Sequence, residues 1–239
     1  MNHLYDHLRD ITFDNSNIRT RDFYMTNLFI GDDVAGKSAF LAAVNKAVVE
    51  QGELATYIAD DRETDVMGLS DAWYFMDDYH SDTKAAALKL IKTIYPDITS
   101  VYIDDNECEM HVVMKDEEEA VSLHDMSEGY CRLLKIIIGC GIVRNGVVVI
   151  DDVDDHFNAE QYLAIWEFLA HATHGMNNQV LIAVRNTDHI KSYAAWLDRN
   201  AGVIDGMAFR IDKENNTEKG MTIAIPYPES ELKAWLASQ

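Results

Sequence analysis

The sequence predicts an α/β fold with a mainly parallel sheet flanked by helices, and three observations support it. A short apolar run at 26–30 precedes a helical spacing of apolar residues over 37–50. From residue 127 onward, helical patterns alternate with strands at 147–150 and 179–184. The first of these strands is an unbroken run of Val and Ile, typical of a parallel strand covered on both faces.

The remaining elements complete this pattern and add a lobe. The other expected helices lie at 83–94, 127–139 and 159–173 and from Glu229 onward; a further strand lies at 53–59, and two more lie within 202–227. Strand-like runs at 98–103, 108–114 and 120–123, separated by turn residues, predict an antiparallel hairpin or meander. We expect one domain over residues 1–239 with an inserted lobe at about 60–123.

Within that lobe, residues 60–82 are acidic and aromatic without clean periodicity, so no structure is assigned to them. Trp73, Tyr74 and Phe75 are interpreted as lobe core, because the surrounding acid disfavours a base-stacking platform.

Composition places the chain among globular proteins. Its 239 residues are 48% hydrophobic and include only 3 Pro. The longest apolar stretch, 133–150, is interrupted by Lys135 and Arg144, so a membrane span is not expected. Without a secretory signal or a metal-ligand spacing among the cysteines, the expected location is the cytoplasm.

The charge balance bears on partners. With 41 acidic and 20 basic residues, the formal net charge is −21. Such a charge opposes nonspecific attraction to nucleic-acid phosphates, so direct nonspecific DNA binding by the isolated chain is not expected. A solvated acidic surface explains the excess, and a basic partner protein is the alternative.

A phosphate-binding motif is the strongest local signal. Residues 31–38 match G-x-x-x-x-G-K-[ST] at every fixed position and lie between a predicted strand and a predicted helix. In this motif backbone N–H groups face the phosphates, the lysine reaches the outer phosphates and the hydroxyl ligates Mg²⁺. We therefore expect ATP with Mg²⁺ to bind Gly31, Asp32, Asp33, Val34, Ala35, Gly36, Lys37, Ser38 and Ala39.

A second group of candidate site residues, Asp151 and Asp152, directly follows the strand at 147–150. Ligands of parallel sheets bind beyond the carboxyl ends of the strands. Asp151 is therefore expected to reach the Mg²⁺ together with Ser38, and Asp152 to orient or deprotonate the attacking water.

The order of these motifs resembles a known family. The phosphate loop is followed by "LHDMSEGYCRLLKIII", "VVVIDDVDDHF" and "NNQVLIAVRNTDHI". This arrangement is similar to the ABC-type ATPases, in the branch that contains RecF, SMC and OLD-like nucleases, and it covers nearly the whole chain. The resemblance implies a homodimer in which two copies enclose two nucleotides.

In that family a short signature at a helix start contacts the nucleotide held by the second subunit. Ser127, Glu128 and Gly129 occupy this place. A hydroxyl, a glycine N–H and a helix N-terminus all favour an anion. The alternative is that Ser127 is only a helix N-cap.

Two positions depart from the family pattern. Asp152 stands where the family has Glu, and Arg185 stands where it has a switch histidine. Arginine can contact a γ-phosphate but cannot accept a proton at neutral pH. ATP binding is therefore expected, with hydrolysis slow, altered or absent. A further hypothesis is that His189 reaches the nucleotide from another position in the fold.

Three functions remain open. The first is a nucleotide-dependent dimerising switch that controls a protein partner, with relatives in DNA repair, chromosome maintenance and phage defence. The second is a catalytically silent nucleotide-sensing scaffold, favoured by Asp152 and Arg185. The third is a small-molecule P-loop kinase, which the Ser-Glu-Gly helix start disfavours.

Overall fold

A seven-stranded sheet forms the centre of the protein. The computed structural model describes residues 18–19, 23–31, 36–59, 66–104, 109–117, 119–153, 156–200, 205–214 and 221–238. The strands are β1 (Ile18–Arg19), β2 (Thr26–Ile30), β3 (Ala55–Ile58), β7 (Val147–Ile150), β8 (Gln179–Val184), β9 (Gly206–Glu214) and β10 (Met221–Tyr227). Their order is β1-β10-β9-β2-β8-β7-β3, and β1 and β10 run opposite to the other five. The predicted mainly parallel sheet is therefore confirmed.

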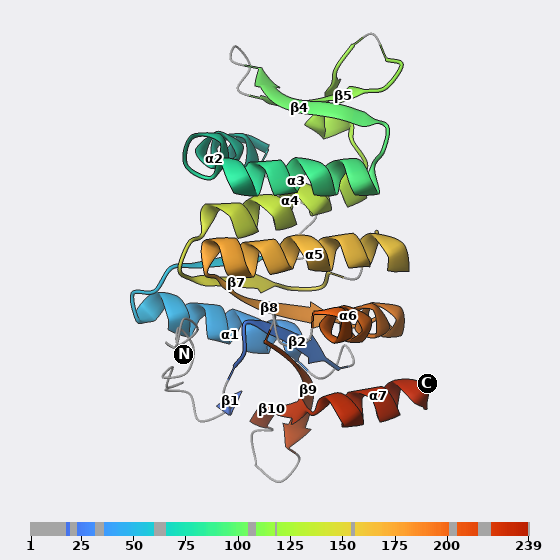
Figure 1. Ribbon diagram of the computed structural model, residues 1–239. Coiled ribbons are helices and arrows are strands. Elements are labelled where there is room, and N and C mark those ends of the chain that lie inside the picture. The colour runs from blue at the N-terminus through green and yellow to red at the C-terminus, as the bar shows by residue number, and fades with distance from the viewer. Residues whose placement is uncertain are drawn as a thin grey trace.

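Helices cover both faces of this sheet (Figure 1). They are α1 (Lys37–Glu50), α2 (Val66–Tyr79), α3 (Ser81–Ile94), α4 (Glu128–Ile142), α5 (Ala159–Met176), α6 (Thr187–Arg199) and α7 (Glu229–Ala237). Helix α1 packs on one face, and α4, α5 and α6 pack on the other. In Figure 1, α5 lies above β7, and α3 packs on α5. Among the described residues, no helix has the length and apolar character needed to cross a bilayer.

Strand β7 shows how the two faces are built. Its side chains alternate between faces, as in any strand. Val148 and Ile150 enter the core formed with α4 and α5, whereas Val147 and Val149 enter the core formed with α1. Because both faces are covered, every position in the strand is apolar and buried.

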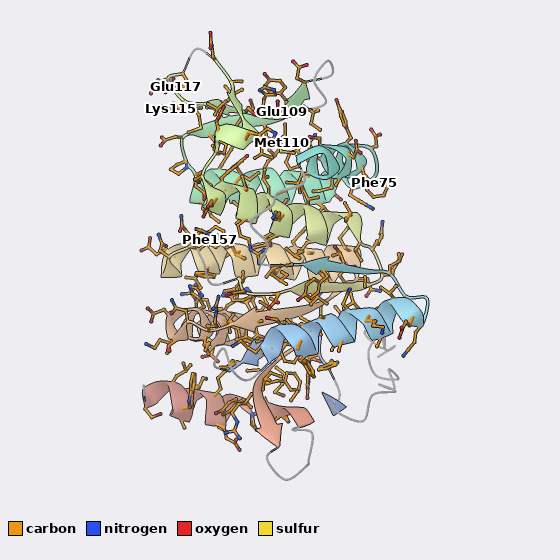
Figure 2. All side chains as sticks on the ribbon, turned by 180° about the vertical axis from the view of Figure 1, so that it is seen from behind. Phe75, Glu109, Met110, Lys115, Glu117 and Phe157 are labelled. Carbon is orange, nitrogen blue, oxygen red and sulfur yellow. The ribbon has the colours of Figure 1, made fainter. Side chains whose placement is uncertain are left out.

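A second, three-stranded sheet lies beyond the helices (Figure 1). It contains β4 (Ile98–Asp104), β5 (Glu109–Met114) and β6 (Val121–Ser122), and both pairings are antiparallel. Met110 and Val112 of β5 belong to the same core as helices α2, α3 and α4, and Met110 is marked in Figure 2. The predicted antiparallel meander is confirmed.

Two helices were not identified in the sequence. Helix α2 occupies most of the stretch left unassigned, with Ser70, Trp73 and Met76 buried at three-residue spacing. The interpretation of the aromatic cluster as core is correct for Trp73 but wrong for Tyr74 and Phe75, which are both 41% exposed. They lie on the outer face because helical spacing turns them away from Trp73.

Helix α6 is the other unassigned helix. Asn186 caps it, accepting a hydrogen bond from the Asp188 amide at 2.8 Å. Ile190, Tyr193 and Ala194 supply the buried face. The cap and this spacing were readable in the sequence.

Candidate nucleotide-binding site

The predicted motifs meet at one edge of the large sheet. Ile30 pairs in register with Val184, and Ile150 pairs with both Ile182 and Ile58. The carboxyl ends of β2, β3, β7 and β8 therefore lie side by side. This edge is where ligands bind in α/β sheets, and it brings the phosphate loop, the Asp pair and the residue after β8 together.

The phosphate loop enters α1 through a glycine turn. Gly36 has φ of 82°, a left-handed conformation that glycine adopts without strain, and it is the N-cap of α1. No side-chain cap bond to the N-terminus of α1 is present among the described residues. A helix N-terminus favours an anion.

Lys37 closes the described part of the loop. Its Nζ donates a hydrogen bond to the Gly31 carbonyl oxygen, and the residue is only 6% exposed. Ser38 and Ala39 are exposed at the start of α1. The remaining predicted loop members, Asp32, Asp33, Val34 and Ala35, lie outside the described residues.

The two aspartates at the end of β7 have different surroundings. The hydroxyl of Tyr57, on β3, donates a hydrogen bond of 2.8 Å to Asp151 Oδ2. Asp152 has φ of 54°, uncommon for a residue other than glycine, and is 9% exposed. Its Oδ2 pairs with Arg185 Nη2, whereas its buried Oδ1 has no hydrogen-bond partner within the described part of the chain.

The ion pair joins Asp152 and Arg185, the two positions expected from the sequence to depart from the family pattern. Asp152 stands at the expected water-activating position and Arg185 at the expected switch position, and each neutralises the other. Arg185 therefore lies against the carboxylate that is expected to act on the attacking water.

Arg132 of α4 ties two strand ends together, a feature that was not predicted. Its guanidinium donates to the carbonyl oxygens of Ala59 at 2.5 Å, Asp151 at 2.5 Å and Asp152 at 3.0 Å. The residue is 7% exposed. A lone arginine in the apolar run "CRLLKIII" was the only sequence signal, and it does not reveal which carbonyls the side chain reaches.

The proposed signature lies at the start of α4. Ser127 is the N-cap, and its Oγ accepts a hydrogen bond from the Tyr130 amide at 3.3 Å. Ser127 therefore caps the helix, and Ser127 and Glu128 are both exposed. A role of these residues as the signature stays a prediction. Burial raises the pKa of the neighbouring Tyr95, and a hydrogen bond with Ser127 opposes that rise.

Gly129 is the buried member of this group. A Cβ added there would lie 3.0 Å from the Tyr95 hydroxyl oxygen and 3.0 Å from His156 Cβ. Glycine thus allows the loop after β7 to approach the helix start. His156 Nε2 also lies 3.9 Å from a Glu128 carboxylate oxygen, so the Asp-pair loop and the proposed signature contact one another.

The structure does not bring His189 into this site. The residue is 2% exposed, and its ring lies against Tyr162 between α6 and α5. Tyr162 in turn donates a hydrogen bond of 2.7 Å to the Val153 carbonyl oxygen. The hypothesis that His189 reaches the nucleotide is therefore not supported; helical packing turns the side chain toward α5.

The residues present fit magnesium and a triphosphate. Ser38 and Asp151 offer hard oxygen donors, which Mg²⁺ prefers, and Lys37 offers a cation for the outer phosphates. No group of three or more His, Cys, Asp or Glu side chains suited to holding a metal occurs among the described residues.

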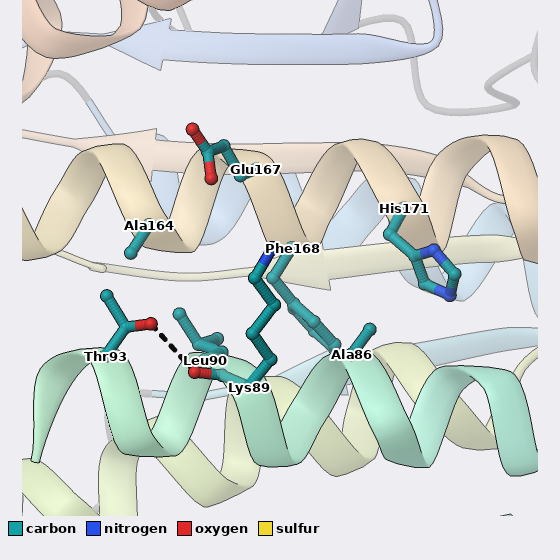
Figure 3. Close-up of a pocket in the computed structure, with 8 residues that line it drawn as sticks. All are labelled: Ala86, Lys89, Leu90, Thr93, Ala164, Glu167, Phe168 and His171. Atoms are coloured by element: carbon teal, nitrogen blue, oxygen red, sulfur yellow. Dashed lines mark hydrogen bonds between the residues drawn. The ribbon is translucent and has the colours of Figure 1, made fainter. Parts of the chain in front are cut away.

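Two cavities lie outside the phosphate loop. One, of about 190 Å³, lies between α3 and α5 (Figure 3) and contains none of the predicted site residues. Its lining residues are Ala86, Lys89, Leu90, Thr93, Ala164, Glu167, Phe168 and His171. The other, of about 270 Å³, lies beside β3 and includes Tyr57 and Ala59, so it reaches the sheet edge described above.

Comparison with known proteins defines the fold. No protein-family model matches the sequence, and no curated protein is a significant match. The structure resembles cbiO1 from Clostridium perfringens, part of the ABC transporter complex cbiONQ, with a TM-score of 0.52 and 11% identity over 90% of this chain and 82% of that one. The chain therefore shares the overall α/β fold of cbiO1.

Smc head domains are also similar. The head with coiled coil and joint from Pyrococcus yayanosii gives a TM-score of 0.46 at 11% identity, over 86% of this chain and 34% of that one. The Pyrococcus furiosus head bound to the C-terminal domain of ScpA gives 0.43 at 9% identity, over 86% and 44%. The chain thus spans less than half of each of these Smc chains.

The first prediction concerns the metal carboxylate. Asp151→Asn should weaken ATP binding when Mg²⁺ is present and leave it unchanged in EDTA, because the substitution removes the charge that the metal requires. Calorimetric titration under both conditions measures this. An equal loss of affinity in EDTA would show that Asp151 serves the fold or the nucleotide directly and not the metal.

Proposed function

We propose that this protein binds ATP with Mg²⁺ and acts as a nucleotide-dependent dimerising switch that controls a protein partner. The observation that carries the proposal is the convergence of the glycine turn, Lys37 and Asp151 at one edge of an ABC-type sheet. Each supplies what a magnesium triphosphate requires: N–H groups, a cation and a carboxylate.

The dimer is supported by the exposed start of α4. Ser127 presents a hydroxyl beside a helix N-terminus, a combination that attracts anions, and its immediate neighbour Glu128 is exposed. In the proposed arrangement the phosphate loop of one copy faces residues 127–129 of the other. Contact between Gly129 and the His156 loop would pass the state of the nucleotide to that interface.

Slow turnover is part of the proposal. The Asp152–Arg185 ion pair occupies both groups that would act on the attacking water and the γ-phosphate. Because hydrolysis is slow, ATP would then stay bound for a long time before it is cleaved, which suits a switch. The same pair favours a second candidate, a catalytically silent nucleotide-sensing scaffold, which measured turnover distinguishes from the first.

A kinase is less well supported. A kinase would use Arg185 to neutralise the phosphoryl group during its transfer, but that guanidinium is paired with Asp152. The other arginine that a kinase could use, Arg199, lies in the last turn of α6.

We propose instead that residues 1–239 form one ATP-binding domain with an inserted lobe at about 60–123. This domain would act on a partner in DNA maintenance or phage defence.

The dimer can be tested at Ser127. Ser127→Arg should prevent ATP-driven dimerisation but retain ATP binding, because the bulky cation enters the interface and not the chain's own phosphate loop. Ser81→Arg, at the exposed start of α3, is the matched control. Light scattering gives the mass and calorimetry the affinity. A variant that still dimerises with ATP would contradict the proposed arrangement.

The net charge gives a second expectation. At physiological salt the isolated protein should bind random duplex DNA weakly or not at all, because a charge of −21 repels phosphates. Fluorescence anisotropy with labelled duplex measures this. Tight binding with a steep salt dependence would mean that basic residues gather on one face.

A further inference from the structure

We propose that Tyr57 is a positioning residue that holds the Asp151 carboxylate in the orientation in which it would meet magnesium. The inference rests on the proposed function, because it assigns a role at the same site. Tyr57 is on β3, whereas Asp151 follows β7, and the two strands pair in parallel. The contact therefore links two neighbouring strand ends.

The hydrogen bond restrains the side chain of Asp151. The Tyr57 hydroxyl donates to Oδ2 at 2.8 Å, a normal length for such a bond to a carboxylate. Asp151 Oδ1 makes no hydrogen bond within the described part of the chain, so the second oxygen is left for another ligand. Arg132 restrains the same residue through its backbone carbonyl. Main chain and side chain are thus fixed by different partners.

The bond requires an intact phenol O–H, because an ionised carboxylate oxygen only accepts hydrogen bonds. Burial, followed by the hydrogen bond and charge of Asp151, raises the pKa of Tyr57 well above its ordinary value. The inferred effect of the hydroxyl is to orient the Asp151 carboxylate.

The inferred consequence concerns metal affinity. Partners that orient a ligating carboxylate typically change metal affinity by about tenfold or more when they are removed. In Tyr57→Phe the ring and its packing are retained and only the hydroxyl is lost. Without the hydroxyl, the Asp151 side chain samples more orientations before the metal binds. Metal binding must then restrict the side chain, and the conformational entropy lost in that step lowers the affinity.

The experiment compares ATP affinity with and without Mg²⁺. For Tyr57→Phe we expect affinity in Mg²⁺ to fall by about tenfold and affinity in EDTA to stay at the parent value. In an Asp151→Asn background the tyrosine substitution should have no further effect, since the two residues act as one unit. Tyr102→Phe, on the exposed face of β4, is the matched control and should behave as the parent.

Several outcomes would overturn the inference. They are unchanged affinity of Tyr57→Phe in Mg²⁺, an equal loss in EDTA, and an additive loss with Asp151→Asn. Thermal melting separates a lost orientation from a destabilised fold, because the former leaves the melting temperature in place. A parent protein that binds no ATP would overturn the proposed function itself, whereas equal binding by parent and variant overturns only this inference.

Discussion

Lys37→Ala is expected to lower ATP affinity by at least about a hundredfold while the protein stays folded. A hydrogen bond to a charged group contributes about 1.5–3 kcal/mol, and the lysine is expected to make more than one with the outer phosphates. A factor of ten in affinity corresponds to about 1.4 kcal/mol. Calorimetric titration of ATP into parent and variant measures the loss.

Helix α1 offers a matched control. Lys46→Ala removes an exposed lysine of the same helix, whose Nζ lies 3.6 Å from a Glu50 carboxylate oxygen. It should bind ATP as the parent does, because an exposed ion pair contributes little. Equal affinity of Lys37→Ala and the parent would contradict the proposed role of the phosphate loop.

The double variant Asp152→Glu with Arg185→His is expected to hydrolyse ATP about a hundredfold faster than the parent. The added methylene moves the carboxylate about an angstrom closer to an in-line water, and a misplacement of that size costs about a hundredfold in rate. Removing the guanidinium also frees the carboxylate to act as a base. Phosphate release under saturating ATP measures the turnover number.

Affinity must change less than turnover for this explanation to hold. An arginine that stabilised the bound and transition states alike would give no acceleration. Its replacement should therefore change turnover through Asp152 and change affinity less. The single variant Arg185→Ala is a useful control, because it leaves the buried Asp152 without its partner and should lower the melting temperature. Fast hydrolysis by the parent, or a double variant no faster than the parent, would show that other residues carry out the chemistry.

Local patterns predicted the core of the fold. The strands at 26–30, 147–150 and 179–184 and the helix at 37–50 have the same bounds in sequence and structure. The strands are buried on both faces, and the apolar residues of the helix follow a helical period, so tertiary packing and local preference agree. The carboxyl-edge position of Asp151 followed from the same rule.

Contacts between distant segments were not predictable in this way. Tyr57 lies 94 residues from Asp151, and no spacing relates the two before the strands are paired. Arg132 and the Asp152–Arg185 pair likewise depend on how β3, β7, β8 and α4 are arranged. Helix α2 was missed for another reason: its exposed aromatic and acidic residues mask the buried positions at three-residue spacing.

The central claim, a nucleotide-dependent dimer, is tested most directly by the mass of the protein in solution. Sedimentation equilibrium should give the 27.1 kDa chain mass with ADP and twice that mass with ATP and Mg²⁺. The dimer should persist with ATP, because turnover is slow while Arg185 holds Asp152. A mass that is the same with ADP and with ATP would contradict the switch, even if both nucleotides bind.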